Sequence, residues 1–218
     1  MGELTPGNLT QTGRREITHL LRSHNLAPSA IYCPLRRGLD IAENLEPRLA
    51  HIRDTMALAF DLGPRLVVIP IGKVPEKEDD PAYALLKEAL LDLGRHGDRT
   101  GVIVALDGVD NPASLATFLD RLDVGSLGVN FNPGQLVIAG QNPHDSIKTL
   151  GRRLIYAHAQ DARRVSPGRM GMVPLGHGDL DWIQILADFE EVGYRGYLTV
   201  LADNQAEAAA GLAFLRRF

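Results

Sequence analysis

The chain has 218 residues, of which 44% are hydrophobic and 23% charged, and its formal net charge is −4. These values are typical of a globular domain with a sizeable core, and the acidic balance argues against nucleic-acid binding, which favours a strongly basic surface. The lone cysteine, Cys33, excludes an intramolecular disulfide. The sequence has neither a signal-like N-terminus nor an apolar run long enough to span a membrane. We therefore expect a cytoplasmic protein outside the membrane.

From residue 14 onward, segments with helical spacing alternate with short apolar runs. In residues 14–24, Ile17, Leu20 and Leu21 repeat at the spacing of an amphipathic helix. Further helices are predicted at residues 43–62, 81–96, 111–122, 145–153, 180–192 and 205–217, and strands at 29–33, 65–72, 101–106, 127–131, 154–159 and 197–200. Because the strands are apolar and alternate with helices, they predict a parallel sheet covered by helices, which is an α/β fold.

The number of strands leaves two architectures open. Six strands suffice for a doubly wound open sheet, whereas a closed α/β barrel needs eight. The turns after the strands contain no G-x-G-x-x-G and no G-x-x-x-x-G-K-[ST] sequence. The sequence therefore lacks the signatures of nucleotide binding.

Four ordered motifs distinguish between these architectures. They are SLGVNFNPG at 126–134, IYAHAQD at 155–161, PLGHGDLDW at 174–182 and EVGYRGYLTV at 191–200. With these motifs the chain resembles the xylose-isomerase-like TIM-barrel family of sugar-phosphate isomerases and epimerases. The resemblance implies a single barrel domain over residues 1–218 that lacks the first βα unit and the second strand, so that about six of eight βα units are present.

The resemblance also implies a metal site at the C-terminal ends of the strands, where α/β barrels keep their active sites. Members of the family hold Mn²⁺, Mg²⁺, Zn²⁺ or Co²⁺ with a Glu, an Asp, a His and a second Glu, and the two glutamates move a proton on the sugar. The corresponding positions here are Asp107, Asn132, His158 and Leu201. Asp107 is thus the implied catalytic residue and, with Asn132 and His158, a metal ligand. Because Leu201 can neither bind a cation nor accept a proton, the implied metal site is weak or absent.

Three further residues are candidate substrate contacts, each with a structural alternative. Asp161 either orients the metal-site histidine or holds the loop after its strand. His177 either contacts a sugar or phosphate oxygen or belongs to a turn in which Asp179 caps the next helix. Arg163 either binds a phosphate through its guanidinium group or is solvated at the surface.

Two functions follow as expectations. The resemblance implies a sugar or sugar-phosphate isomerase or epimerase that uses metal-assisted proton transfer. The residues at Asn132 and Leu201 favour instead a non-catalytic barrel remnant that binds a small carbohydrate or a partner subunit, and a homo-oligomer would cover its open sheet edges. Repair of abasic DNA, which the same barrel supports elsewhere, needs more metal ligands than this acidic chain supplies.

Overall fold

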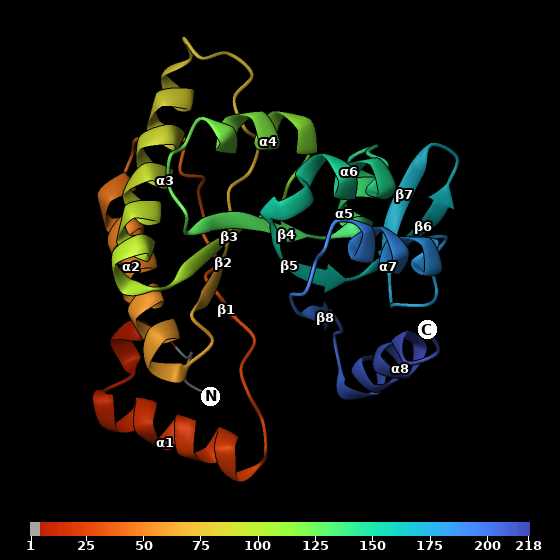
Figure 1. The fold of residues 1–218 in the computed structure, drawn as a ribbon, viewed down its shortest axis with the longest axis horizontal. Coiled ribbons are helices and arrows are strands. Elements are labelled where there is room, and N and C mark those ends of the chain that lie inside the picture. The colour runs from red at the N-terminus through yellow and green to blue at the C-terminus, as the bar shows by residue number, and fades with distance from the viewer. Residues whose placement is uncertain (1–4) are drawn as a thin grey trace. The chain divides into compact units, whose positions relative to one another are not determined.

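The computed structural model describes residues 5–218 (Figure 1). The chain forms two compact units, one of residues up to 106 together with 120–128, the other of residues 107–119 and 129–218. In the sheet the strands follow the order β1-β2-β3-β4-β5-β8, and β6 and β7 form a separate two-stranded sheet. Since a complete barrel of the TIM type has eight strands, the predicted incomplete α/β barrel is confirmed. That the chain is a single domain stays a prediction.

The N-terminal unit consists of three long helices and three strands. In chain order its elements are η1 (Pro6–Asn8), α1 (Gln11–Ser23), β1 (Ile31–Tyr32), α2 (Leu45–Leu62), β2 (Leu66–Pro70), α3 (Pro81–Thr100) and β3 (Ile103–Asp107), whose last residue belongs to the other unit. Helix α2 packs against α1, α3 and β2. The strand at β1 is shorter than predicted because only Ile31 and Tyr32 pair with β2, in parallel.

Helix α3 extends four residues beyond its predicted end. Asp80 caps its start by accepting a hydrogen bond from Ala82 N at 2.9 Å, and Gly101, with a φ of +70°, ends it. Near that end Gly97 lies so close to the segment that leads into β3 that a Cβ would stand 2.5 Å from the carbonyl oxygen of Val102.

No helix within residues 5–218 is long and apolar enough to cross a bilayer.

Cys33 follows β1 and is a packing residue. Its side chain is 1% exposed, and Thr55 Oγ1 on α2 lies 3.6 Å from its sulfur. Burial raises the pKa of the Cys33 thiol, against the opposing effect of the Thr55 hydrogen bond. A thiol held in its protonated form is a poor nucleophile, which agrees with the absence of a predicted role.

The C-terminal unit carries the remaining elements, except that Asp120 of α4 and the first two residues of β4 belong to the N-terminal unit. They are α4 (Pro112–Asp120), β4 (Leu127–Phe131), α5 (Pro133–Ile138), α6 (Pro143–Leu150), η2 (Gly151–Arg153), β5 (Leu154–Ala159), β6 (Asp161–Ser166), β7 (Arg169–Val173), α7 (Trp182–Glu191), β8 (Leu198–Val200) and α8 (Gln205–Leu215). Strand β5 pairs in parallel with β4 on one side and with β8 on the other, and His158 lies opposite Thr199. The carboxyl ends of these strands therefore meet at one edge.

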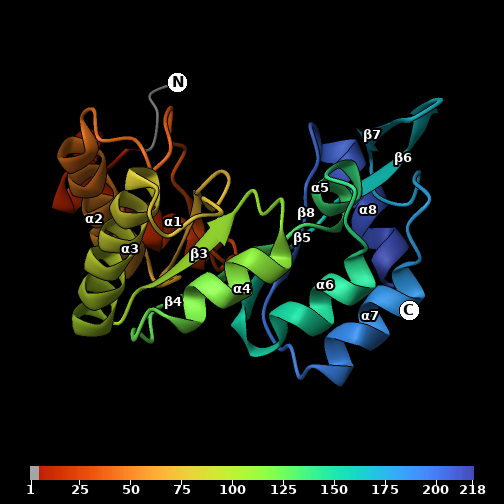
Figure 2. The ribbon, with the colours of Figure 1, turned by 90° about the horizontal axis from the view of Figure 1, so that it is seen from above.

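Three elements of this unit were not predicted from the sequence. Helix α5 has only six residues, and β6 and β7 form an antiparallel hairpin between β5 and α7. Both strands of the hairpin pack against α5, as Figure 2 shows. The hairpin escaped prediction because β6 is polar and largely exposed after its first two residues, so it lacks the apolar pattern of a buried strand.

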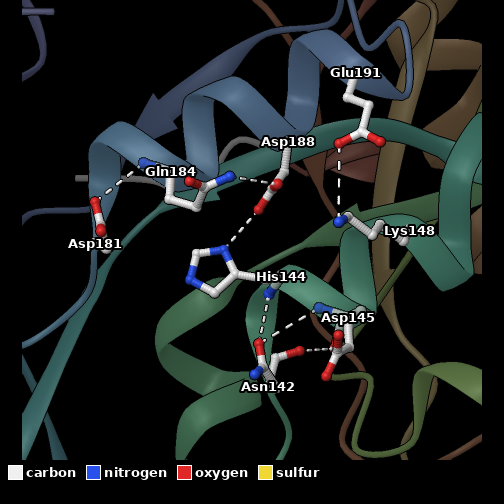
Figure 3. A network of polar contacts seen from close by, with 9 residues as sticks. Asn142, His144, Asp145, Lys148, Asp181, Gln184, Asp188 and Glu191 are labelled. Carbon is white, nitrogen blue, oxygen red and sulfur yellow. Dashed lines mark hydrogen bonds and ion pairs between the residues drawn. The ribbon is translucent and has the colours of Figure 1, made fainter.

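A buried carboxylate joins α6 to α7 (Figure 3). Asp188 on α7 is 1% exposed, its Oδ2 lies 2.6 Å from Nδ1 of His144 on α6, and its Oδ1 accepts a 3.0 Å hydrogen bond from Gln184. Burial alone would raise the pKa of Asp188, but the bonds from Gln184 and His144 and the nearby charge of Lys148 hold it below its ordinary value. A looser pair, Lys148 with Glu191 at 3.9 Å, lies at the exposed rim.

Candidate functional site

A chain of three buried polar side chains crosses the strands of the C-terminal unit. Asp107 ends β3, Asn130 lies in β4 and His158 in β5, and they are 6%, 2% and 8% exposed. The Asn130 amide nitrogen donates a 2.6 Å hydrogen bond to Asp107 Oδ1 and lies 2.9 Å from His158 Nδ1. The structure thus brings together the predicted residues Asp107 and His158, with Asn130 as the bridge.

The contact with Asn130 determines which nitrogen of the neutral His158 ring carries the proton. Since the amide nitrogen of Asn130 is a donor, His158 Nδ1 accepts, and the neutral ring carries its proton on Nε2. Burial lowers the pKa of His158, and the negative charge of Asp107 opposes this effect. The Oδ1 atom of Asn130 is buried and has no hydrogen-bond partner within residues 5–218. This oxygen is therefore an unsatisfied acceptor inside the cluster, and its desolvation has a cost in stability.

Asn132, the predicted third ligand, is engaged elsewhere. Its Oδ1 caps α5 by accepting a 3.1 Å bond from Gln135 N, and its amide nitrogen donates to Gln160 Oε1 at 2.9 Å. The structure accordingly uses Asn132 to start a helix and to hold Gln160 at the end of β5.

Asn130 and Gln160 are the site residues that the sequence analysis missed. Asn130 is two positions before Asn132, and alternate residues of a strand share a face, so a polar side chain inside an apolar strand was the available signal. Gln160 lies directly after β5, outside the strand, so no such signal marked it.

Asp161 organises the segment between β7 and α7. This carboxylate is 1% exposed and accepts hydrogen bonds from the backbone N–H groups of Ala162, Gly176 and Leu180 at 3.0, 3.1 and 3.4 Å. The indole N–H of Trp182 donates a fourth bond at 3.3 Å. With four donors satisfied, Asp161 matches the loop-holding alternative, and its contact with a substrate stays a prediction.

The other two candidate substrate contacts are exposed. His177 lies in the turn after β7, and Arg163 lies in β6. The prediction that Asp179 caps the next helix is wrong, because its carboxylate accepts a 3.1 Å bond from Arg164 N, while Asp181, directly before Trp182, caps α7. The structure does not join His177 or Arg163 to the Asp107 cluster by any hydrogen bond within residues 5–218, and their roles stay predictions.

A cavity of about 330 Å³ opens beside the C-terminal ends of β5 and β8. Five of its eight lining residues are apolar, and the other three supply an amide and two carboxylates; the lining residues are Gln160, Met172, Val173, Pro174, Leu201, Ala202, Asp203 and Glu207. Glu207 is committed to the start of α8, where it accepts bonds from Asn204 and from Asp203 N. Leu201, the position at which the resemblance implies the second Glu, lies in the wall of this cavity.

The donor set does not fit the divalent cation that the resemblance implies. Within residues 5–218 no group of three His, Cys, Asp or Glu side chains could hold a metal ion. Asp107 and His158 supply only one carboxylate and one imidazole, and both receive hydrogen bonds from Asn130. Structural and catalytic zinc sites in proteins use three or four protein ligands.

Residues 3–218 match the family described as xylose isomerase-like TIM barrel. The chain belongs to this family. Among curated proteins, an uncharacterized protein of Methanocaldococcus jannaschii is 25% identical over 181 residues, which are 77% of this chain. The chain spans about 60% of the length of that relative.

Solved structures of xylose isomerase-like proteins share the fold. A xylose isomerase domain protein from Planctomyces limnophilus superposes with a TM-score of 0.87 at 23% identity, covering 95% of this chain and 83% of its own. A Mycobacterium smegmatis barrel protein in complex with magnesium gives 0.77 at 21%, covering 96% and 78%. A D-allulose 3-epimerase from Methylomonas sp. in complex with D-allulose gives 0.76 at 16%, covering 97% and 83%.

Proposed function

We propose that this xylose isomerase-like chain binds a small uncharged carbohydrate without catalysing the metal-assisted proton transfer of an isomerase or epimerase. The observation that carries the proposal is the cavity at the ends of β5 and β8, which Leu201 lines. Leu201 is the position at which the resemblance implies a catalytic Glu. Barrel enzymes bind their substrates at this end of the strands. The cavity supports binding there, while its lining argues against the chemistry.

The cavity suits a sugar in size and in composition. Pockets for small ligands usually begin at about 300 Å³ and combine apolar walls with a few polar groups. Met172 and Leu201 offer apolar surface to the C–H face of a sugar ring, whereas Gln160 and Asp203 offer an amide and a carboxylate to its hydroxyls. The lining contains acidic residues but no Lys or Arg, so it favours a free sugar over a sugar phosphate.

The residues at hand do not support epimerisation, which removes a proton from one face of a carbon atom and returns one to the opposite face. Such a reaction needs an acid–base group on each side of the substrate, and general acid–base assistance contributes about 10²–10⁴-fold in rate. Asp107 is the single carboxylate of the buried cluster, and it accepts its hydrogen bond from Asn130. The side chain of Leu201 cannot replace the opposing base. We therefore expect ketohexose epimerisation to be undetectable above background.

A metal-dependent isomerase or epimerase is the second candidate, and the relatives favour it. Structural neighbours include a D-tagatose 3-epimerase-like protein and a protein in complex with magnesium. If this candidate holds, Asp107, Asn132 and His158 act as ligands, and Asn132 gives up its bonds to Gln135 and Gln160. The cost of breaking these bonds should make cation binding weak.

Calorimetric titration with sugars tests the binding proposal. D-Fructose, D-tagatose and D-allulose are compared with D-fructose 6-phosphate, and we expect the free sugars to bind more tightly. A Leu201→Trp variant fills the cavity and should abolish binding, whereas Ile183→Trp, at a position 66% exposed on α7, should leave it unchanged. No binding of any sugar, or equal binding by both variants, would overturn the proposal.

Titration with Mn²⁺ separates the two candidates. The proposal predicts no micromolar Mn²⁺ binding by the chain and no change on His158→Ala, because the described residues supply too few ligands. Micromolar binding that disappears in His158→Ala, together with epimerisation of a ketohexose in the presence of Mn²⁺, would establish the metal-dependent candidate instead.

A further inference from the structure

A second cavity, of about 400 Å³, lies in the N-terminal unit and is rich in positive charge. Six residues of α1 and one of α2 line it, and three of them are arginines; the lining residues are Gln11, Arg14, Arg15, Thr18, His19, Arg22 and Asp61. The chain as a whole carries a net charge of −4. The positive charge of this cavity is thus opposite in sign to the net charge of the protein.

The spacing along α1 turns these side chains to one face of the helix. Arg15, His19 and Arg22 are separated by four and three residues, so they are neighbours on the helix surface. Glu16, the acidic residue of α1, follows Arg15 by one position and is therefore turned about 100° away. It does not line the cavity.

The charges of the cavity are only partly neutralised. Arg14 is fixed, with its Nη1 2.6 Å from Asp61 and its other nitrogens donating to the carbonyl oxygens of Leu9 and Pro6. Asp61 is thereby paired with Arg14, and it accepts a further bond from Gln11 at 3.4 Å. The side chains of Arg15, His19 and Arg22 have no hydrogen bond or ion pair within residues 5–218.

We propose that this cavity is a binding site for a phosphate-bearing small molecule, separate from the carbohydrate site. Guanidinium groups match phosphate oxygens with paired N–H donors, and two free arginines beside a histidine supply several such donors. The pairing of Asp61 with Arg14 limits its repulsion of an anion. The volume leaves room for more than one phosphate group.

The arrangement of α1 favours a soluble ligand over a lipid surface. Leu20 is 57% exposed, but it precedes Arg22 by two residues, so the two side chains lie on nearly opposite sides of the helix. Membrane-surface helices insert a wide apolar face with basic residues at its borders. If Leu20 inserted into a bilayer, the arginines of the cavity would point away from that bilayer.

Titration with inorganic pyrophosphate at low ionic strength tests the site. We expect binding that weakens in 0.5 M NaCl and falls at least about tenfold in the double variant Arg15→Gln/Arg22→Gln, since charged hydrogen bonds are lost. The matched control is Arg95→Gln/Arg99→Gln, which removes two exposed arginines from α3, the second of them in its last turn, as Arg22 is in the last turn of α1. Thermal unfolding of both variants checks that each is folded.

Three outcomes would overturn this proposal. One is the absence of pyrophosphate binding by the unaltered chain, which would mean that the arginines are simply solvated. Another is an equal loss in both double variants, which would indicate nonspecific attraction. The third is retention on phosphatidylserine vesicles, lost in Arg15→Gln/Arg22→Gln, without pyrophosphate binding. The Leu201→Trp variant should bind pyrophosphate normally, so failure of the carbohydrate proposal would not affect this one.

Discussion

Asp161 is a buried carboxylate whose four hydrogen bonds fold the chain between β7 and α7. The glycines of the segment match this role, since a Cβ on Gly178 would stand 1.9 Å from Asp161 Oδ1 and 2.6 Å from the carbonyl oxygen of Ala162. The GHGD motif therefore leaves room for the carboxylate. This close approach explains the motif without requiring that His177 touch a ligand.

Replacing Asp161 by Asn should destabilise the C-terminal unit by about 2–4 kcal/mol, because an amide nitrogen would then face N–H donors. Asp179→Asn is the matched control: Asp179 is exposed and accepts one backbone bond, so its loss should cost less than about 1 kcal/mol. Urea unfolding followed by circular dichroism measures both. Equal destabilisation of the two variants would contradict the assigned role of Asp161.

At this scale the sequence predicted part of the site. Asp107 and His158 were expected together because the resemblance implies a metal site at the ends of the strands, and the structure joins them through Asn130. The position of Asn132 could not be foreseen in the same way. Whether an amide faces a neighbouring strand or caps the next helix depends on where that helix begins, and α5 is too short to show a period.

Among the elements, the longer helices and the apolar strands were predicted, whereas the six-residue helix α5 and the polar β6–β7 hairpin were missed. All six strands of the main sheet were found, with boundaries that shift by a few residues. The β6–β7 hairpin was missed because its side chains beyond Ala162 are largely exposed, and because its turn carries Pro167 and Gly168, which were not used as a turn signal.

Asp188 should make the pairing of α6 with α7 sensitive to acid. Its folded pKa lies below the ordinary value of 3.8, so its stabilisation is complete above that value and is lost as the pH falls toward the folded pKa. We expect Asp188→Asn to lower stability by about 1–3 kcal/mol at pH 7. The difference from the unaltered chain should shrink below about pH 4, where the carboxylate of the latter becomes protonated.

Urea midpoints measured between pH 7 and pH 3 would show this convergence. Glu191→Gln serves as the control because Glu191 belongs to the same helix but forms only an exposed pair with Lys148 at 3.9 Å, and exposed pairs contribute little. A constant gap between Asp188→Asn and the unaltered chain across the pH range would refute the linkage.

For the whole molecule, the strand order leaves β1 and β8 at the ends of the sheet. Backbone groups at such edges can pair with another chain, and we expect the protein to form a homo-oligomer through one of them. Tyr197, directly before β8, is 58% exposed. Light scattering should give a mass above that of one chain. Tyr197→Glu should reduce this mass, whereas Ile183→Glu should leave it unchanged. A monomer at all concentrations would exclude this assembly.

The cavity at β5 and β8 has walls of two different origins. Leu201 comes from the end of a strand of the parallel sheet, whereas Met172 and Val173 come from the hairpin, which makes its ladder with no strand of that sheet. Insertions or exchanges within the hairpin can therefore reshape one wall while the sheet keeps its sequence. Ligand preference in proteins built this way can diverge during evolution much faster than the scaffold that carries it.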